Sequence, residues 1–138
     1  MHSILVKDYM DRTPHAINEN SAVRSAITTL MKEQIPGAPV VNDKKMLVGF
    51  VSEQDCIREM LNDAFYCEES PSVTTVMSKD VLTVSPETSI LELAESMTKN
   101  RPKIYPVCDN GKLIGLISRR LILNALIENN EDCFLYNK

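Results

Sequence analysis

The pentapeptide Val6-Lys7-Asp8-Tyr9-Met10 (VKDYM) has a counterpart 67 residues later, Val73-Thr74-Thr75-Val76-Met77 (VTTVM), with the same first and last residues. With one residue deleted in between, Gly49-Phe50-Val51-Ser52 returns 66 residues later as Gly115-Leu116-Ile117-Ser118. Matches spread over so much of the chain indicate an internal duplication. We therefore expect a first repeat at residues 1–62, a linker at 63–72, a second repeat at 73–128 and a C-terminal tail at 129–138.

Hydrophobic periodicity is similar in the two repeats. Apolar residues three and four positions apart predict amphipathic helices, short apolar runs predict strands, and Asn110-Gly111 marks a hairpin turn. The elements predicted in this way are helices at 22–31, 53–64, 90–97 and 119–128 and strands at 38–41, 46–51, 104–108 and 113–117, with short strands around 15–17 and 81–84. Each repeat therefore reads as β-α-β-β-α, in the α+β class.

A repeat of about 60 residues buries too little apolar surface to be securely stable alone. The two repeats are therefore expected to pack sheet face on sheet face about a pseudo-twofold axis. The cleft between them is the natural place for a ligand.

Composition narrows the function. The 138 residues carry a formal net charge of −4, which argues against generic affinity for nucleic acid or an anionic membrane. The N-terminus lacks the basic and long apolar regions of a secretion signal, and no apolar run approaches the roughly 20 residues of a membrane span. We expect a cytoplasmic protein with reduced thiols and no metal site, because no metal-ligand spacing links its cysteines and histidines: Cys56, Cys67, Cys108, Cys133, His2 and His15.

The most informative stretch is Gly49-Phe50-Val51-Ser52-Glu53-Gln54-Asp55, which joins a predicted strand to a predicted helix. Ser52 and Asp55 project from the first helical turn, where a carboxylate could grip the vicinal diol of a ribose. Ser-x-x-Asp before an amphipathic run is also close to a capping box, with Ser52 as the N-cap. The residues leave both interpretations open, and both could hold together.

The second repeat has a different chemistry at the equivalent place. Leu121 replaces the acid, and Arg119 and Arg120 occupy the first helical turn, where cations oppose the helix dipole. A ligand phosphate or an acidic side chain, for example from Glu68-Glu69, would relieve that conflict. Arg101 and Lys103 add positive charge shortly before the predicted strand at 104–108.

No catalytic assembly is visible in the motifs. The chain has no Ser-His-Asp order and no G-x-S-x-G, P-loop, G-x-G-x-x-G or H-E-x-x-H sequence. We interpret His15 as a packing or pocket-lining residue, and Met10 and Met77 as fillers of a core or interface. The hypothesis of a nucleotide-hydrolysing enzyme has the least support, because the sequence shows no carboxylate cluster for a metal and no positioned base.

Together these motifs resemble a tandem pair of CBS domains, a Bateman module, over roughly residues 6–128. The resemblance rests on the repeated V-x-x-x-M, the amphipathic helix, Pro-Val before a polar turn, and Gly-hydrophobic-hydrophobic-Ser at the end of the last strand. It implies a duplicated β-α-β-β-α unit without catalysis. It also implies binding of an adenosyl ligand such as AMP, ADP, ATP or S-adenosylmethionine, with no required cofactor.

The resemblance assigns roles to particular residues. Asp55 would hold the ribose hydroxyls and Ser52 the phosphate or ribose, with Phe50 and Val51 against the nucleoside. The second repeat would contribute an adenine-lining residue and phosphate contacts: Leu82, Lys103, Arg120 and, more weakly, Arg101. In the pseudo-symmetric cleft Leu121 replaces the acid, so His15 and Ser118 would line a site expected to be empty or weak.

A stand-alone module of this kind resembles a regulatory subunit. We expect a homodimer formed through exposed helices, an adenosyl ligand that alters how modules or a separate effector protein sit together, and no nucleic-acid or membrane partner. The rival hypothesis is a structural dimerisation module without a ligand, in which Ser52 and Asp55 only cap a helix.

Overall fold

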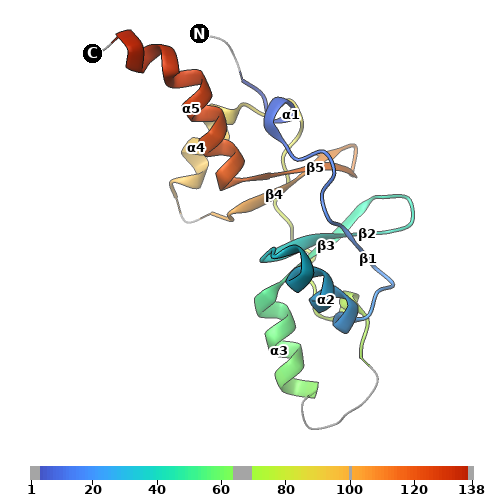
Figure 1. The fold of residues 1–138 in the computed structure, drawn as a ribbon. Coiled ribbons are helices and arrows are strands. Elements are labelled where there is room, and N and C mark those ends of the chain that lie inside the picture. Colours follow the sequence, from blue (N-terminus) through green and yellow to red (C-terminus); the bar gives the residue numbers. More distant parts are fainter. Residues whose placement is uncertain (1–3, 64–69, 100, 137–138) are drawn as a thin grey trace. The chain divides into compact units, whose positions relative to one another are not determined.

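The computed structural model describes residues 4–63, 70–99 and 101–136, and the side chains among them except those of 63 and 130–136 (Figure 1). The chain forms two compact units. We call the described part of residues 15–81 and 111–113 the first-repeat unit. The described part of residues 1–14, 82–110 and 114–138 is the second-repeat unit.

The first-repeat unit is built on a three-stranded sheet. Its middle strand β2 (Gly37–Val41) is buried throughout, runs parallel to β1 (Ile17–Asn18) and pairs antiparallel with β3 (Leu47–Ser52). Helices α2 (Val23–Glu33) and α3 (Glu53–Asp63) supply apolar faces to this sheet. The resulting aliphatic core consists of Ile17, Val23, Ala26, Leu30, Ala38, Val40, Val51, Cys56 and Val73.

The second-repeat unit is built on the hairpin of β4 (Ile104–Asp109) and β5 (Lys112–Ser118). Asn110 and Gly111 form its turn with φ values of 52° and 82°, the left-handed region that a tight hairpin needs. Val84 makes a parallel bridge to Val107, where the sequence predicts a short strand. Helices α4 (Ile90–Met97) and α5 (Arg119–Tyr136) complete the unit.

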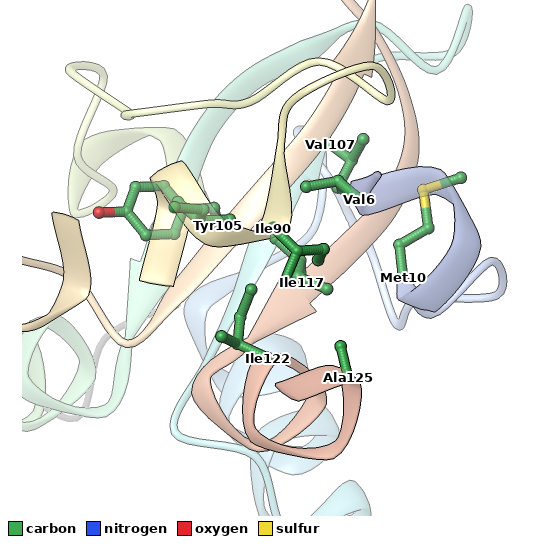
Figure 2. Close-up of a cluster of buried hydrophobic side chains, with 9 residues drawn as sticks. Val6, Met10, Ile90, Tyr105, Val107, Ile117, Ile122 and Ala125 are labelled. Carbon is green, nitrogen blue, oxygen red and sulfur yellow. The ribbon is translucent and has the colours of Figure 1, made fainter. Parts of the chain in front are cut away.

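The core of the second-repeat unit draws on segments far apart in the sequence. Figure 2 shows most of this cluster, in which Val6 of α1 (Val6–Tyr9) joins residues of α4, β4, β5 and α5. Its buried members are Val6, Met10, Ile90, Leu93, Tyr105, Val107, Ile117, Ile122 and Ala125. Tyr105 is the aromatic member of an otherwise aliphatic and methionine core, as the composition predicts.

The V-x-x-x-M segments pack with the opposite repeat. Val6 is fully buried in the second-repeat unit, whereas Val73, the first residue of the 3₁₀ helix η1 (Val73–Thr75), is fully buried in the first-repeat unit. Asp11 and Leu116 exchange two backbone hydrogen bonds of 2.8 and 3.0 Å, and Phe50 and Ser78 exchange two of 2.9 Å. The sequence repeats at 1–62 and 73–128 are therefore not the packing units, because each begins with a segment that completes the other.

Two boundaries also differ from the sequence prediction. Helix α5 continues to Tyr136, well beyond residue 128, because no glycine or proline interrupts the segment expected to be a tail. The predicted linker at 63–72 lies mostly outside the described residues. Its last part is built into the first-repeat unit, since Ser72 accepts a hydrogen bond from the Thr74 backbone at the start of η1.

Candidate functional site

The junction of β3 and α3 forms a complete capping box. The Ser52 backbone N–H and hydroxyl each donate to Asp55 Oδ2 at 2.9 Å, and the Asp55 backbone N–H donates to Ser52 Oγ at 3.1 Å. The reciprocal bonds satisfy backbone donors that the first turn of a helix leaves without partners. The capping interpretation of this motif is therefore confirmed.

Capping uses one oxygen of Asp55, and the other has one weak polar neighbour among the side chains that the structure describes. Oδ2 receives both bonds from Ser52, whereas Oδ1 lies 3.6 Å from Nη1 of Arg58, whose side chain is 72% exposed. An exposed pair at that distance contributes little free energy. Because a carboxylate has about four lone-pair sites on its two oxygens, Asp55 can cap α3 and still accept hydrogen bonds from hydroxyl groups of a ligand.

Phe50 and Val51, the other residues expected at this junction, have different surroundings. The Val51 side chain is fully buried in the core, so Val51 could offer a ligand only its main chain. Phe50 is half-buried, and its ring lies against Gly37, where a Cβ would meet Phe50 Cζ at 3.0 Å. Of the four residues expected to contact a ligand here, Phe50, Ser52 and Asp55 keep side chains that are not fully buried.

The second repeat forms half of the same capping motif. Ser118 Oγ accepts the Leu121 backbone N–H at 3.3 Å, but Leu121 has no carboxylate to return the bond. The Leu121 side chain instead packs against the core of the second-repeat unit. A diol-binding acid is thus missing at this position, as the sequence indicates.

Basic residues gather at the start of α5. The Arg119 backbone N–H donates to the Lys103 carbonyl at 3.0 Å, which places the segment carrying Lys103 beside the first helical turn with Arg119 and Arg120. These side chains and that of Arg101 are exposed, and none has an ion-pair partner among the described residues. The proposed acidic partner, Glu68-Glu69, lies outside the described residues. Because positive side chains at a helix N-terminus oppose the helix dipole, an anion bound beside them would be stabilised by both the side chains and the dipole.

The remaining expected site residues lie in both units. Leu82 of the second-repeat unit is 51% exposed. In the first-repeat unit, His15 Nε2 lies 3.1 Å from Glu33 Oε2 at the end of α2. The structure therefore brings Phe50, Ser52 and Asp55 together in one unit and Lys103, Ser118 and Arg120 together in the other.

A groove between α2 and α3 was not anticipated from the sequence. It has a volume of about 320 Å³ and an almost wholly apolar lining of Ile27, Leu30, Met31, Glu53, Cys56, Ile57, Met60 and Leu61. Its apolar residues on α3 belong to the same stripe as the buried Cys56, but Ile57, Met60 and Leu61 are exposed. The amphipathic periodicity of the sequence predicts only that one face of each helix packs inward.

The structure describes the side chains of two cysteines, Cys56 and Cys108. Cys56 and Cys108 are free, and burial raises the pKa of each thiol above its ordinary value, with Asp55 and Glu53 adding to the effect at Cys56. Among the side chains that the structure describes, no three His, Cys, Asp or Glu residues are grouped to hold a metal ion. Within the described helices, none combines the length and apolarity needed to cross a membrane.

Comparison with known proteins identifies the class of this fold. The family model for the CBS domain matches twice, at residues 6–62 and 73–128. A crystal structure of CBSX2 in complex with AMP is 26% identical, with a TM-score of 0.80 over 91% of this chain and 98% of that chain. The CBS-domain containing protein ATU1752 from Agrobacterium tumefaciens is 25% identical, with a TM-score of 0.72 over 89% of this chain and 93% of that one.

Sequence relatives include proteins much longer than this chain. Uncharacterized protein MJ1426 of Methanocaldococcus jannaschii is 30% identical, over 90% of this chain and 92% of the relative. The A-adding tRNA nucleotidyltransferase of Aquifex aeolicus is 31% identical over 91% of this chain, which spans only 15% of that enzyme. This chain also covers only 39% of the length of another relative, uncharacterized protein MJ1225 of M. jannaschii. This chain is a member of the CBS domain family and contains two CBS repeats.

Proposed function

We propose that this chain is a non-catalytic regulatory module that binds an adenosyl compound, such as AMP, ADP, ATP or S-adenosylmethionine, in a cleft between its two repeats. Binding would signal to a partner by favouring one arrangement of the repeats, since a ligand shifts an equilibrium only through different affinities for its states. The AMP complex of the similar CBSX2 supports an adenosyl ligand. We also propose a homodimer in the cytoplasm, a compartment consistent with the free Cys56 and Cys108.

The observation that carries this proposal is that the two carboxylate oxygens of Asp55 have different surroundings. Its Oδ2 caps α3, whereas the polar neighbour of Oδ1 among the described side chains is Arg58, at 3.6 Å. Oδ1 would accept the ribose hydroxyls, Phe50 and Leu82 would contact the base, and Val51 would contribute its backbone. Ser52, Lys103, Arg120 and, more weakly, Arg101 would receive the phosphate.

The pseudo-symmetric cleft, with His15 and Ser118, would bind weakly or not at all. Leu121 provides no acceptor for a diol. His15 is engaged with Glu33. We therefore propose one ligand per chain.

Calorimetric titration with AMP, ATP and S-adenosylmethionine tests the proposal. Asp55→Asn keeps an oxygen for the Ser52 cap but removes the charge offered to the ribose, so affinity should fall about tenfold or more with little change in melting temperature. Ser89→Ala is the control, because Ser89 Oγ caps α4 by accepting the Glu92 N–H at 3.4 Å and Ser89 is not among the proposed ligand contacts. Unchanged affinity in Asp55→Asn would show that the ribose assignment is wrong.

A structural dimerisation module without a ligand is the second candidate. The complete capping box favours it, because Ser52 and Asp55 already have a structural role. In that case none of the three compounds would release heat or raise the melting temperature, whereas a bound ligand must stabilise the folded state by mass action.

A further inference from the structure

Residues 4–11, which we call the strap, contact three elements of the second-repeat unit. The beginning of the strap forms backbone hydrogen bonds with the loop before α4. At its end, Asp11 pairs through the backbone with Leu116 of β5. Between these points Met10 lies in the core cluster (Figure 2), and Tyr9 reaches α5. The strap therefore joins the loop before α4, the strand β5 and the helix α5 of one unit.

The Tyr9 hydroxyl is bonded to two adjacent residues of α5. It donates to Glu128 Oε2 at 2.7 Å and accepts a hydrogen bond from Asn129 Nδ2 at 2.9 Å. Asn129 Nδ2 also donates to the Ala125 carbonyl at 2.7 Å, which holds the amide against its own helix. Because one partner is a carboxylate, the contact includes a charge-assisted hydrogen bond. Tyr9 thus uses both the donor and the acceptor of its hydroxyl on α5.

The basic residues proposed to bind a phosphate lie at the other end of the same helix. Strand β5 runs directly into α5, which begins at Arg119. Glu128 lies eight residues after Arg120, which is about 12 Å along the helix axis at about 1.5 Å per residue. Apolar packing holds the middle of α5 without directional preference, whereas hydrogen bonds prefer particular directions. The contact with Tyr9 can therefore fix the tilt and rotation of the helix that carries Arg120.

We propose that Tyr9 is a positioning residue for phosphate binding. By holding α5 through Glu128 and Asn129, it keeps the first helical turn in the orientation in which Arg120 meets the phosphate of a ligand. Tyr9 acts through the helix and does not itself touch the ligand. The inference rests on the proposed function, because it concerns the cations that are assigned there to the phosphate.

Calorimetry of the full chain with AMP and with adenosine tests this role. Tyr9→Phe removes the hydroxyl and keeps the ring, so AMP binding should weaken about three- to tenfold, the effect of one hydrogen bond, while adenosine binding stays unchanged. Glu128→Ala should give the same loss for AMP. Because both changes break one contact, the double variant should bind AMP no more weakly than either single variant.

Two further variants separate the hydrogen bond from other effects. Glu128→Gln keeps an acceptor for Tyr9 but removes the charge, and it should bind AMP within about twofold of wild type. Lys7→Gln is the matched control within the strap. It removes the ion pair of Lys7 with Glu87, at 3.1 Å, and leaves the contact with α5 in place. AMP affinity should not change in this variant.

Hydrogen exchange of the full chain without ligand tests the positioning independently of nucleotide. The amides of Arg119 and Leu121 are hydrogen-bonded at the first turn of α5, whereas the Cys108 amide is hydrogen-bonded in β4. In Tyr9→Phe the first two amides should exchange at least about threefold faster than in wild type, and the Cys108 amide should exchange at its wild-type rate. A difference confined to the first turn is local opening rather than loss of global stability.

Three results would each overturn the inference. They are equal AMP affinity in wild type and Tyr9→Phe, equal losses for AMP and adenosine, and exchange at Arg119 and Leu121 that Tyr9→Phe leaves unchanged. Failure of the proposed function looks different. If neither AMP nor adenosine binds to wild type but Tyr9→Phe still speeds exchange at the first turn, the ligand assignment is rejected and the positioning of α5 by Tyr9 stands.

Discussion

Met10 packs directly on Gly115: a Cβ built on this glycine would lie 2.7 Å from Met10 Sδ and 2.8 Å from the Asp11 carbonyl oxygen. Met77 makes the corresponding contact with Gly49 in the other unit. The glycine of each Gly-hydrophobic-hydrophobic-Ser motif therefore allows the V-x-x-x-M segment of the opposite repeat to approach the strand. The two most recognisable motifs of the duplication are parts of one packing contact.

Gly115→Ala should consequently destabilise the fold by about 1–3 kcal/mol, because the added methyl group meets backbone as well as side chain. Urea denaturation measures the change. Combining Gly115→Ala with Met10→Ala removes the sulfur from the clash, so the double variant should lose less stability than the two single losses added together. Strict additivity would mean that the contact between these residues does not determine the cost.

The basic residues at the start of α5 should distinguish phosphorylated from unphosphorylated ligands. Lys103→Ala and Arg120→Ala should each weaken AMP binding about tenfold, the effect of one charge-assisted hydrogen bond, while leaving adenosine binding unchanged. Calorimetry with both ligands makes the comparison. Lys99→Ala, an exposed lysine after α4, is the control. Equal losses for AMP and adenosine would exclude a phosphate contact.

Leu121→Asp should complete the second capping box and create a second diol-binding site. The new carboxylate could accept from Ser118 as Asp55 does from Ser52, and Arg119 and Arg120 lie in the same first turn. Leu121 is only half-buried, so we expect a stability change of about 1–2 kcal/mol or less. The AMP stoichiometry measured by calorimetry should rise from one to two. Leu121→Asn, which lacks the charge, should retain a stoichiometry of one.

The sequence predicts the local elements well because they depend on local physics. Apolar periodicity locates the four main helices, and Asn110-Gly111 locates a turn with two positive φ values. The Ser-x-x-Asp spacing gives the capping box directly. The burial of Val51 also follows from strand alternation, since Gly49 and Val51 are both buried in β3. The strand period thus argues against the side-chain contact with a nucleoside that the family resemblance implies for Val51.

Features that depend on which repeat a segment contacts could not be predicted. The V-x-x-x-M pattern is present in both repeats, so its residues fit either one, and only the packing of Val6 and Val73 shows the exchange. The α2–α3 groove could not be predicted for a related reason. Ile57 and Leu61 satisfy a helical period, but periodicity alone does not separate residues that pack inward from those left at the surface.

Tyr9 should titrate above its ordinary value, since its hydroxyl donates a 2.7 Å hydrogen bond to Glu128 Oε2, which raises the pKa. Asn129 opposes this in part by donating to the same hydroxyl at 2.9 Å. The folded chain thus holds the tyrosine proton more tightly than the unfolded chain does. The associated stabilisation is present below about pH 10 and is lost as the pH rises through the folded-state pKa.

Selective ¹³C labelling of tyrosine ring carbons allows the Tyr9 titration to be followed by NMR. Glu128→Gln removes the negative charge at the acceptor and should bring the pKa of Tyr9 back toward 10. Glu92→Gln, on the exposed side of α4, is the control and should leave it unchanged. If Tyr9 titrates alike in the wild type and Glu128→Gln, the hydrogen bond between α1 and α5 is not what holds the proton.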